Sequence, residues 1–188
     1  MSKRIFSIIL PTFNNEQFLA PCIKSIYDTG MMTPIGLGEL IIVNNGKQPI
    51  KEQYGHWPYL KVIDSPENVG WEGGLKLGLE ASTADFVCFQ NDDTFIPHSS
   101  YNFYQELLYP FQDKSIAAVG PSTTVAAGIQ SIFHPAHPHG VQDVRWLIFF
   151  TVMIRRAHMD TVGGVDTLLP GGDDIDLSIR FNNAGYKT

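Results

Sequence analysis

Two adjacent carboxylates, Asp92 and Asp93, follow a short apolar run in the middle of this chain. The run, residues 86–89, consists mainly of β-forming residues, so it predicts a buried central strand. The carboxylates then lie at the carboxyl end of that strand, where open α/β sheets bind their ligands. Clustered carboxylates there suit Mg²⁺ or Mn²⁺, above all beside the phosphates of a substrate. A surface turn is the alternative, because Asn and Asp favour turns for purely local reasons.

A second acidic pair, Asp173 and Asp174, opens the last predicted helix after two glycines. Asp is a good residue at a helix start, so capping is one interpretation of the pair. One capping Asp would be enough, and the second leaves a carboxylate free to face a site. Asp176 and Arg180 are four residues apart, and we expect them to pair across a helix turn, a contact worth roughly 0.2–0.5 kcal/mol.

Neither the histidines nor the cysteines form a ligand set. His134, His137 and His139 alternate with prolines, which block the i, i+4 geometry of a helical zinc site. We therefore interpret residues 121–144 as a partly exposed loop on the acceptor side of a site. Cys22 and Cys88 show no CxxC spacing, and free thiols in a reducing compartment fit best.

The elements that must position these residues alternate between strands and helices. Strands are predicted to end at residue 10 and to cover residues 38–43, 60–64, 86–89, 115–120 and 146–155, and helices to begin near residue 16 and to cover residues 75–81, 101–108 and 173–184. This alternation predicts an α/β protein with a Rossmann-like, mainly parallel, doubly wound sheet and flanking helices. Three glycines within residues 70–74 let backbone approach a ligand, although glycine-rich turns also occur without one.

Length and charge restrict the class of protein. The 188 residues suit one domain, which would bury roughly 70% of the surface of the unfolded chain. The net charge is −6 and no basic cluster is present, which disfavours a nucleic-acid partner. The apolar run of residues 5–10 stops at a Pro before it reaches the length of a membrane span. We expect a cytoplasmic protein without a membrane segment of its own, and peripheral association with the inner face of the membrane stays open.

Five segments follow a recognisable order: residues 8–14 (IILPTFN), 42–46 (IVNNG), 68–74 (NVGWEGG), 89–94 (FQNDDT), and 163–166 (GGVD) with 173–180 (DDIDLSIR). In this order they resemble the family-2 glycosyltransferases of the GT-A fold, most nearly the rhamnosyltransferase-like branch that builds bacterial surface polysaccharides. The resemblance implies inverting, metal-assisted transfer of a hexosyl or deoxyhexosyl group from a nucleotide-diphosphate sugar. The acceptor would be the hydroxyl of a saccharide or of a lipid-linked molecule, and the cofactor Mg²⁺ or Mn²⁺.

The resemblance also implies roles for individual residues. The nucleotide would be bound by Pro11, Thr12, Asn14, Asn44, Asn68, Gly70, Gly74 and Asp92. Asp93 would be the main metal ligand, with Asn91 at the first position of the family's Asp-x-Asp motif. Asp174 would be the general base, with Asp173 beside it.

The chain departs from the family in three places. Asn44 and Asn91 stand where the family usually has Asp, so base and ribose preference could differ and the metal could bind more weakly. The family continues beyond the Gly-Tyr at residues 185–186, whereas this chain ends at Thr188. We therefore expect residues 1–188 to be a single catalytic domain that is shortened at its C-terminus.

Two other functions remain in view. A nucleotidyltransferase that makes nucleotide sugars has a similar sheet, but it would show glycine and a basic residue directly after the first strand, and residues 11–15 contain neither. A non-catalytic nucleotide-sugar-binding module of the same fold is favoured by Asn44, Asn91 and the short C-terminus. Nucleotide binding without turnover would identify such a module.

Overall fold

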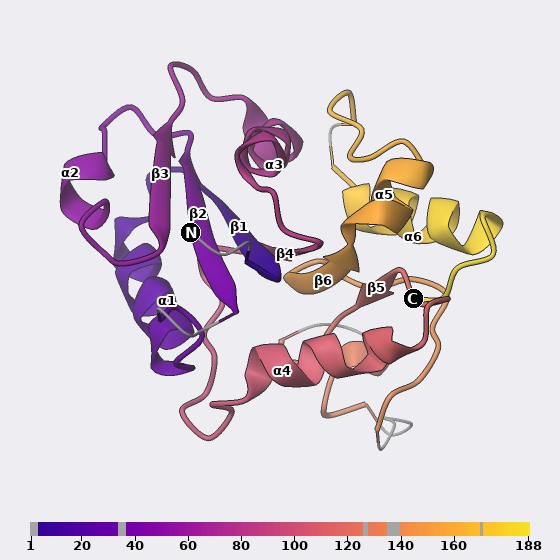
Figure 1. Cartoon of the computed structure of the whole chain (residues 1–188). Helices are drawn as coiled ribbons and strands as arrows, with labels where there is room; N and C mark the ends of the chain where they lie inside the picture. The colour runs from indigo at the N-terminus through magenta and orange to yellow at the C-terminus, as the bar shows by residue number, and fades with distance from the viewer. Residues whose placement is uncertain (1–3, 34–36, 126–127, 135–139, 170) are drawn as a thin grey trace.

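A six-stranded sheet with strand order β3-β2-β1-β4-β6-β5 forms the centre of the chain (Figure 1). It is seen in a computed structural model that describes residues 4–33, 37–125, 128–134, 140–169 and 171–188. The strands are β1 (Phe6–Thr12), β2 (Gly38–Asn44), β3 (Leu60–Asp64), β4 (Phe86–Gln90), β5 (Ala118–Val119) and β6 (Thr151–Arg155). The first four strands are parallel, while β6 is antiparallel to both β4 and β5. The mainly parallel α/β sheet predicted from the sequence is confirmed.

Helices cover both faces of the sheet (Figure 1). One face packs against α1 (Glu16–Asp28) and α4 (Phe103–Leu108), and the other against α3 (Gly70–Ala81), α5 (Arg156–Thr161) and α6 (Asp173–Asn183). β1 contributes to the apolar core on both faces of the sheet. Ile8 and Leu10 pack in the core on the α1 and α4 face, and Ile9 packs in the core on the opposite face. Such burial on both faces explains why the strands are continuously apolar rather than alternating. The short helices are α2 (Lys51–Tyr54), η1 (Tyr109–Gln112) and η2 (Gly128–Gln130).

The apolar run of residues 146–155 is a strand only over its second half, which corrects the predicted strand. β6 begins at Thr151. Before it, the amide of Leu147 donates to Ser178 Oγ at 3.2 Å and the amide of Ile148 donates to Gln130 Oε1 at 2.6 Å. Side chains thus satisfy backbone donors that would otherwise pair with a neighbouring strand. An apolar composition alone could not reveal these acceptors.

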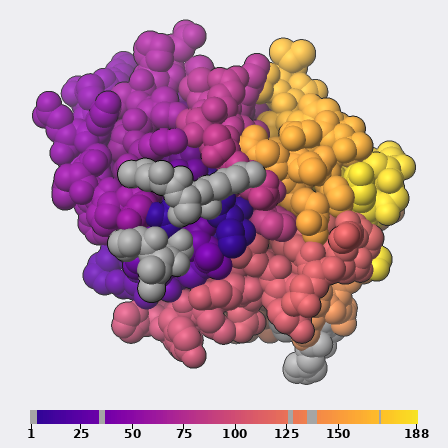
Figure 2. All heavy atoms as spheres, viewed as in Figure 1, coloured from indigo at the N-terminus to yellow at the C-terminus, as the bar shows by residue number. Residues whose placement is uncertain are grey.

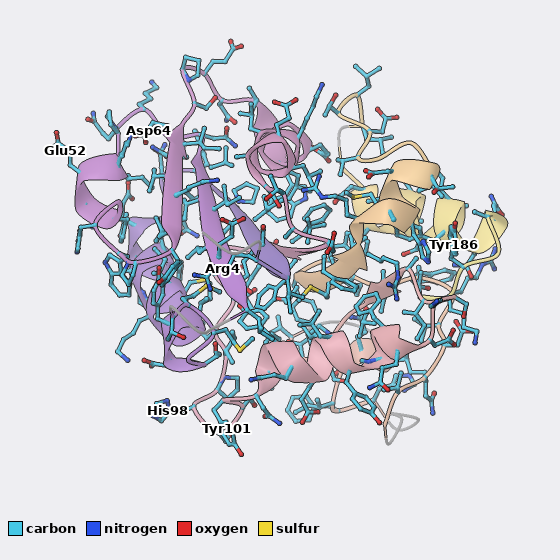
Figure 3. All side chains as sticks on the ribbon, viewed as in Figure 1. Arg4, Glu52, Asp64, His98, Tyr101 and Tyr186 are labelled. Carbon is cyan, nitrogen blue, oxygen red and sulfur yellow. The ribbon has the colours of Figure 1, made fainter. Side chains whose placement is uncertain are left out.

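The last helix is held much as its sequence predicts. Arg180 donates to Asp176 one turn earlier, and also to the carbonyls of Val162 and Gly164 at 2.7 and 2.8 Å. Gly185 follows the helix with φ +82°, a left-handed conformation that suits glycine. Tyr186, which is labelled in Figure 3, follows. Its ring stacks on that of His158 of α5, with ring centroids 3.9 Å apart.

The two halves of the chain adjoin in the face shown in Figure 2, where α4 lies along the lower edge.

Both cysteines are free and buried, as the sequence predicts. No helix in the described part of the chain is long and apolar enough to cross a membrane.

Candidate active site

The turn that carries the central carboxylates is fixed by backbone contacts on both sides. The amide of Asn91 donates to the carbonyl of Phe150 at 2.9 Å, and Thr94 Oγ1 donates to the same carbonyl at 3.2 Å. The amide of Thr94 closes the turn on the carbonyl of Asn91 at 3.2 Å. The segment before β6 therefore anchors the turn at the carboxyl end of β4.

A buried chain of side-chain hydrogen bonds supports the turn from beneath. Tyr104 donates to Gln90 Oε1 at 2.9 Å, Gln90 Nε2 donates to Cys22 Sγ at 3.7 Å, and Cys22 Sγ donates to the carbonyl of Asn91 at 3.7 Å. Burial raises the pKa of the Cys22 thiol to about 12, against a smaller lowering by Gln90, so the thiol stays protonated and can donate. These bonds connect α4, β4 and α1 to the carboxylate turn.

The two carboxylates of the turn differ in their surroundings. Asp92 Oδ2 accepts from Thr12 Oγ1 at 2.6 Å, and Asp92 Oδ1 accepts from Asn15 Nδ2 at 2.8 Å. Asp93 is exposed and has no hydrogen-bond or ion-pair partner among the described residues. Asp92 therefore connects the turn to the β1–α1 segment, and Asp93 is the carboxylate that is free to bind a ligand.

These residues line a cavity of about 520 Å³ at the carboxyl ends of β1, β2 and β4. Seven of the residues predicted from the sequence lie in its wall: Pro11, Thr12, Asn68, Gly70, Asn91, Asp92 and Asp93. Gly70 has φ +75° and its amide donates to Asn68 Oδ1 at 2.9 Å, so glycine is needed where α3 begins at the cavity.

Three predicted nucleotide-binding residues do not line the cavity. Asn44 is buried, and its side chain bonds the carbonyl of Gln48, the carboxylate of Asp64 (Figure 3) and the amide of Gly46 at 2.7–2.8 Å. Gly74 packs closely against β1: a Cβ at this position would lie only 2.9 Å from Pro11 Cβ. Asn14 is exposed with φ +50°. A nucleotide role for these residues stays a prediction, and in this structure the contacts of Asn44 and Gly74 hold the scaffold of the site.

Four lining residues were missed by the sequence reasoning: Phe13, Asn15, Asn45 and Trp71. Asn45 joins two walls, because it donates to the carbonyl of Gly70 at 2.9 Å and accepts from the amide of Val69 at 3.4 Å. It follows Asn44 directly, and only the register of β2 tells the two apart. Phe13 is 51% exposed and lies in a turn of Pro, Thr and Asn. An aromatic residue in such a polar turn is the sequence feature that could have marked it as a ligand-binding residue.

The second acidic pair, Asp173 and Asp174, does not line this cavity and is connected to its wall through Trp71. Trp71 Nε1 donates to Asp173 Oδ2 at 3.1 Å. Asp173 is 8% exposed; burial raises its pKa, the bond from Trp71 lowers it, and the charges of Asp174 and Glu72 raise it further. Asp174 is partly exposed, and its Oδ1 accepts from the amide of Ile175 at 2.7 Å. The pair therefore consists of one buried and one accessible carboxylate.

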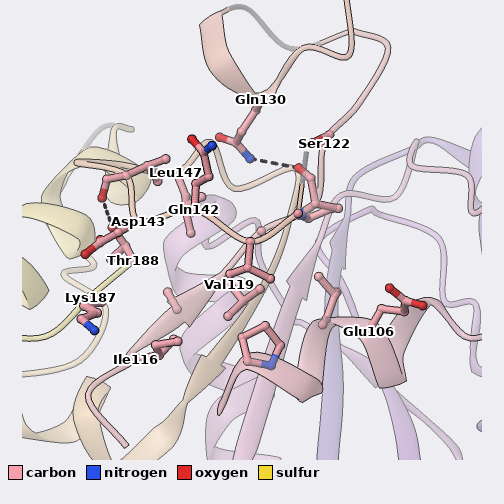
Figure 4. A pocket seen from close by; sticks show the side chains of 18 of the residues that line it. Glu106, Ile116, Val119, Ser122, Gln130, Gln142, Asp143, Leu147, Lys187 and Thr188 are labelled. Atoms are coloured by element: carbon pink, nitrogen blue, oxygen red, sulfur yellow. Dashed lines mark hydrogen bonds between the residues drawn. The ribbon is translucent and has the colours of Figure 1, made fainter. Parts of the chain in front are cut away.

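A larger cavity of about 670 Å³ lies elsewhere, between α4, β5 and parts of residues 120–147 (Figure 4). Lys187 and Asp113, which form an ion pair at 3.1 Å, line it together with Gln130 and Thr188. None of the described residues predicted to bind nucleotide or metal lies in its wall. His137 and His139 of the predicted loop lie outside the described residues. The residues predicted to bind nucleotide and metal thus single out the smaller cavity.

A parallel sheet with carboxylates and a glycine-rich helix start at its carboxyl edge is typical of nucleotide-dependent enzymes. Residues 7–166 match the profile described as Glycosyl transferase family 2, and the chain belongs to that family. The pre-mycofactocin glycosyltransferase of two Mycobacterium tuberculosis strains is 24% identical over 204 residues, covering 99% of this chain. The match covers 41% of that protein, so the chain spans about two fifths of its curated relatives.

Solved structures share the fold. The mannosyltransferase PcManGT of Pyrobaculum calidifontis, in complex with GDP-Man and Mn²⁺, has a TM-score of 0.74 at 16% identity, over 99% of this chain and 54% of that one. Staphylococcus aureus TarS 1-349 in complex with UDP-GlcNAc has a TM-score of 0.69 at 17% identity, over 93% of this chain and 52% of that one. GalNAc-T7 with UDP, GalNAc and Mn²⁺ has a TM-score of 0.73 at 13% identity, over 98% of this chain and 42% of that one. The chain has the GT-A fold, and the predicted membership of the family-2 glycosyltransferases is confirmed.

Proposed function

We propose that this chain transfers a hexosyl or deoxyhexosyl group from a nucleotide-diphosphate sugar, with inversion, to the hydroxyl of a saccharide or lipid-linked acceptor. One observation carries the proposal: the carboxylate turn after β4, the end of β1 and the start of α3 line one cavity, with the acidic start of α6 bonded to its wall. Membership of glycosyl transferase family 2 supports the reaction class. Cell-surface glycan synthesis is the proposed setting.

The donor set near Asp93 fits a divalent ion that a substrate helps to hold. No group of three or more His, Cys, Asp or Glu gathers anywhere in the described ranges, so the protein alone offers no closed metal cage. Mg²⁺ sites commonly use one or two carboxylates together with substrate phosphates. Asp93 would supply the carboxylate and Asn91 an amide oxygen, and both line the cavity. When bound, such an ion supplies positive charge beside a departing diphosphate.

The remaining chemistry belongs to the chain itself. The acceptor hydroxyl attacks the anomeric carbon of the donor sugar as the bond to the diphosphate breaks, which inverts that carbon. We assign the hydroxyl proton to Asp174, the accessible carboxylate of the pair and the one that aligns with the family's base. Asp92, Thr12 and Asn15 hold the cavity wall in place through their mutual hydrogen bonds.

A screen of nucleotide sugars tests this function. UDP-, GDP- and dTDP-sugars are added with Mn²⁺, and the melting temperature is followed. Binding to the folded state adds about 2.7 kcal/mol of stability at a hundredfold excess over Kd. We expect one nucleotide class to stabilise the chain and to be turned over, with an inverted anomeric product by NMR. Stabilisation without turnover of any donor would instead support the non-catalytic binding module, and a retained configuration would contradict the mechanism.

A further inference from the structure

The bond between Trp71 and Asp173 joins α3 to α6 through two residues that are 102 positions apart in the sequence. Trp71 is in the first turn of α3 and lines the cavity of about 520 Å³, which is called the donor cavity below because the proposed donor would bind there. Asp173 is the first residue of α6. Among the described residues, no other hydrogen bond or ion pair connects these two helices. The amino end of α6 is therefore held to the cavity wall at one polar contact.

The other restraints on α6 act further along the helix. Arg180 ties the second turn to residues 162 and 164, and Asn182 Nδ2 donates to the carbonyl of Arg145 at 3.0 Å. Before the helix, Gly171 and Gly172 have φ +117° and +82°, and the N-cap residue, Gly172, has no side chain with which to cap the first turn. Two consecutive glycines with positive φ leave the entry to α6 with little intrinsic stiffness. Within the described ranges, Asp174 itself bonds only its own neighbour in the chain, Ile175.

We propose that Trp71 is a positioning residue that holds Asp173, and through it sets Asp174 at the edge of the donor cavity. This inference rests on the proposed function, in which Asp174 accepts the acceptor proton. An indole N–H suits this role, because it satisfies the buried carboxylate of Asp173 without placing a positive charge beside the base. Burial, together with the charges of Asp174 and Glu72, raises the pKa of Asp173, while the bond from Trp71 and a backbone hydrogen bond lower it. A lysine or arginine in the same place would neutralise the pair.

Matched substitutions separate positioning from chemistry. Trp71→Phe keeps an aromatic ring in the cavity wall but removes the donor. Asp173→Ala removes the acceptor, whereas Asp173→Asn retains an oxygen that the indole can bond. We expect Trp71→Phe and Asp173→Ala to lower kcat roughly 10- to 100-fold, as misplacement of a catalytic group does, with nucleotide affinity changed much less. Asp173→Asn should restore most of the kcat that Asp173→Ala loses, and the double variant Trp71→Phe/Asp173→Ala should be no worse than either single one.

Two further measurements make the test decisive. Hydrogen exchange at the amides of residues 175 and 176 should speed up in Trp71→Phe and Asp173→Ala. Asn182→Ala removes two bonds at the far end of α6, to the carbonyls of Arg145 and Ser178, and should leave both exchange and kcat unchanged. An unaltered kcat and exchange rate in Trp71→Phe would overturn the proposal. So would an Asp173→Asn variant as inactive as Asp173→Ala, because the Asp173 carboxylate would then be the reacting group. If the wild-type chain transfers no sugar, the proposed function fails, while hydrogen exchange still decides whether the bond holds α6.

Discussion

Adjacent acidic residues in this chain have unlike roles. Asp92 accepts two hydrogen bonds from the β1–α1 segment, while Asp93 is exposed and unpartnered within the described residues. Asp173 is buried against Trp71, while Asp174 stays accessible. In both pairs, one carboxylate holds the structure and leaves its neighbour free for chemistry.

The two members of the first pair should differ in their effect on stability. Asp92→Ala leaves the buried hydroxyl of Thr12 and the amide of Asn15 without their acceptor, and we expect a loss of about 1–3 kcal/mol in the free energy of unfolding. Asp93→Ala removes no hydrogen bond to any described residue and should change that free energy by less than about 0.5 kcal/mol. Urea unfolding of both variants measures the difference. Equal losses would contradict the assignment of Asp92 to the scaffold.

Replacing Asp174 separates catalysis from its contact at the helix start. Asp174 Oδ1 accepts from the amide of Ile175, and the side-chain oxygen of Asn can accept the same bond, so Asp174→Asn should keep its melting temperature and its nucleotide affinity. An amide cannot accept the acceptor proton, and transfer should fall by roughly 10²–10⁴-fold. Initial rates at saturating donor provide the measurement. Full transfer by a stable Asp174→Asn enzyme would move the base to Asp173, where Asp173→Asn would then be the inactive variant.

The stability cost of burying Asp173 should depend on pH. Its folded-state pKa is raised, chiefly by burial, so the folded chain binds this proton more tightly than the unfolded chain does. The ionised group therefore costs stability as the pH rises through its folded-state pKa, and the cost vanishes below its unfolded value of about 3.9. We expect Asp173→Asn to be more stable than wild type at pH 7, and the two to converge in urea titrations as the pH falls to about 4. A difference that does not vary with pH would rule out this explanation.

At the scale of the elements, the close approach of α3 to β1 brings the glycine-rich helix start to the cavity. Gly74 abuts Pro11, and a Cβ on Gly78 would lie 2.3 Å from Ile9 Cγ2. Without this contact, the first turn of α3 would stand further from the carboxylate turn. The glycines of α3 therefore have two roles. Gly70 lines the site, whereas Gly74 and Gly78 allow the helix to pack closely against β1.

Gly78→Ala tests how tightly α3 is seated. Ala favours helix by about 1 kcal/mol over Gly, but the new methyl must displace Ile9 or the helix. Overpacking of this kind costs typically about 1–3 kcal/mol, and we expect a net loss of stability together with weaker nucleotide binding. Thermal unfolding and calorimetry would show both effects, and Lys76→Ala, on the exposed side of the same helix, is the control. A stabilised Gly78→Ala variant would mean that α3 can shift without cost.

At the scale of the whole molecule, the strands of the sheet could be predicted because both of its faces are buried. Apolar runs ending in polar residues located β1 to β4 and the edge where their carboxyl ends meet. The sequence could not show that β6 enters antiparallel between β4 and β5, since its apolar run looks the same in either direction. It also could not show that Ser178 and Gln130 bond residues 147 and 148 and delay that strand.

The site was readable from the sequence to the extent that it follows strand ends. The last two residues of β1 and the three residues after β4 were predicted and do line the cavity. Asn45 and Trp71 were not predicted, because which side chain enters a cavity depends on strand register and on contacts across long sequence separations. The supporting chain from Tyr104 to Asn91 was equally invisible, since its members lie on three separate elements.

The central claim is that the cavity at the sheet edge binds a nucleoside diphosphate through a metal held chiefly by Asp93. Isothermal titration of UDP or GDP into the wild-type chain, with and without Mn²⁺, tests it most directly. We expect Mn²⁺ to tighten binding by at least roughly tenfold, or about 1.4 kcal/mol, Asp93→Ala to abolish that gain, and Asn91→Asp to enlarge it. Nucleotide binding by a folded Asp93→Ala chain with wild-type affinity and wild-type Mn²⁺ dependence would contradict the account.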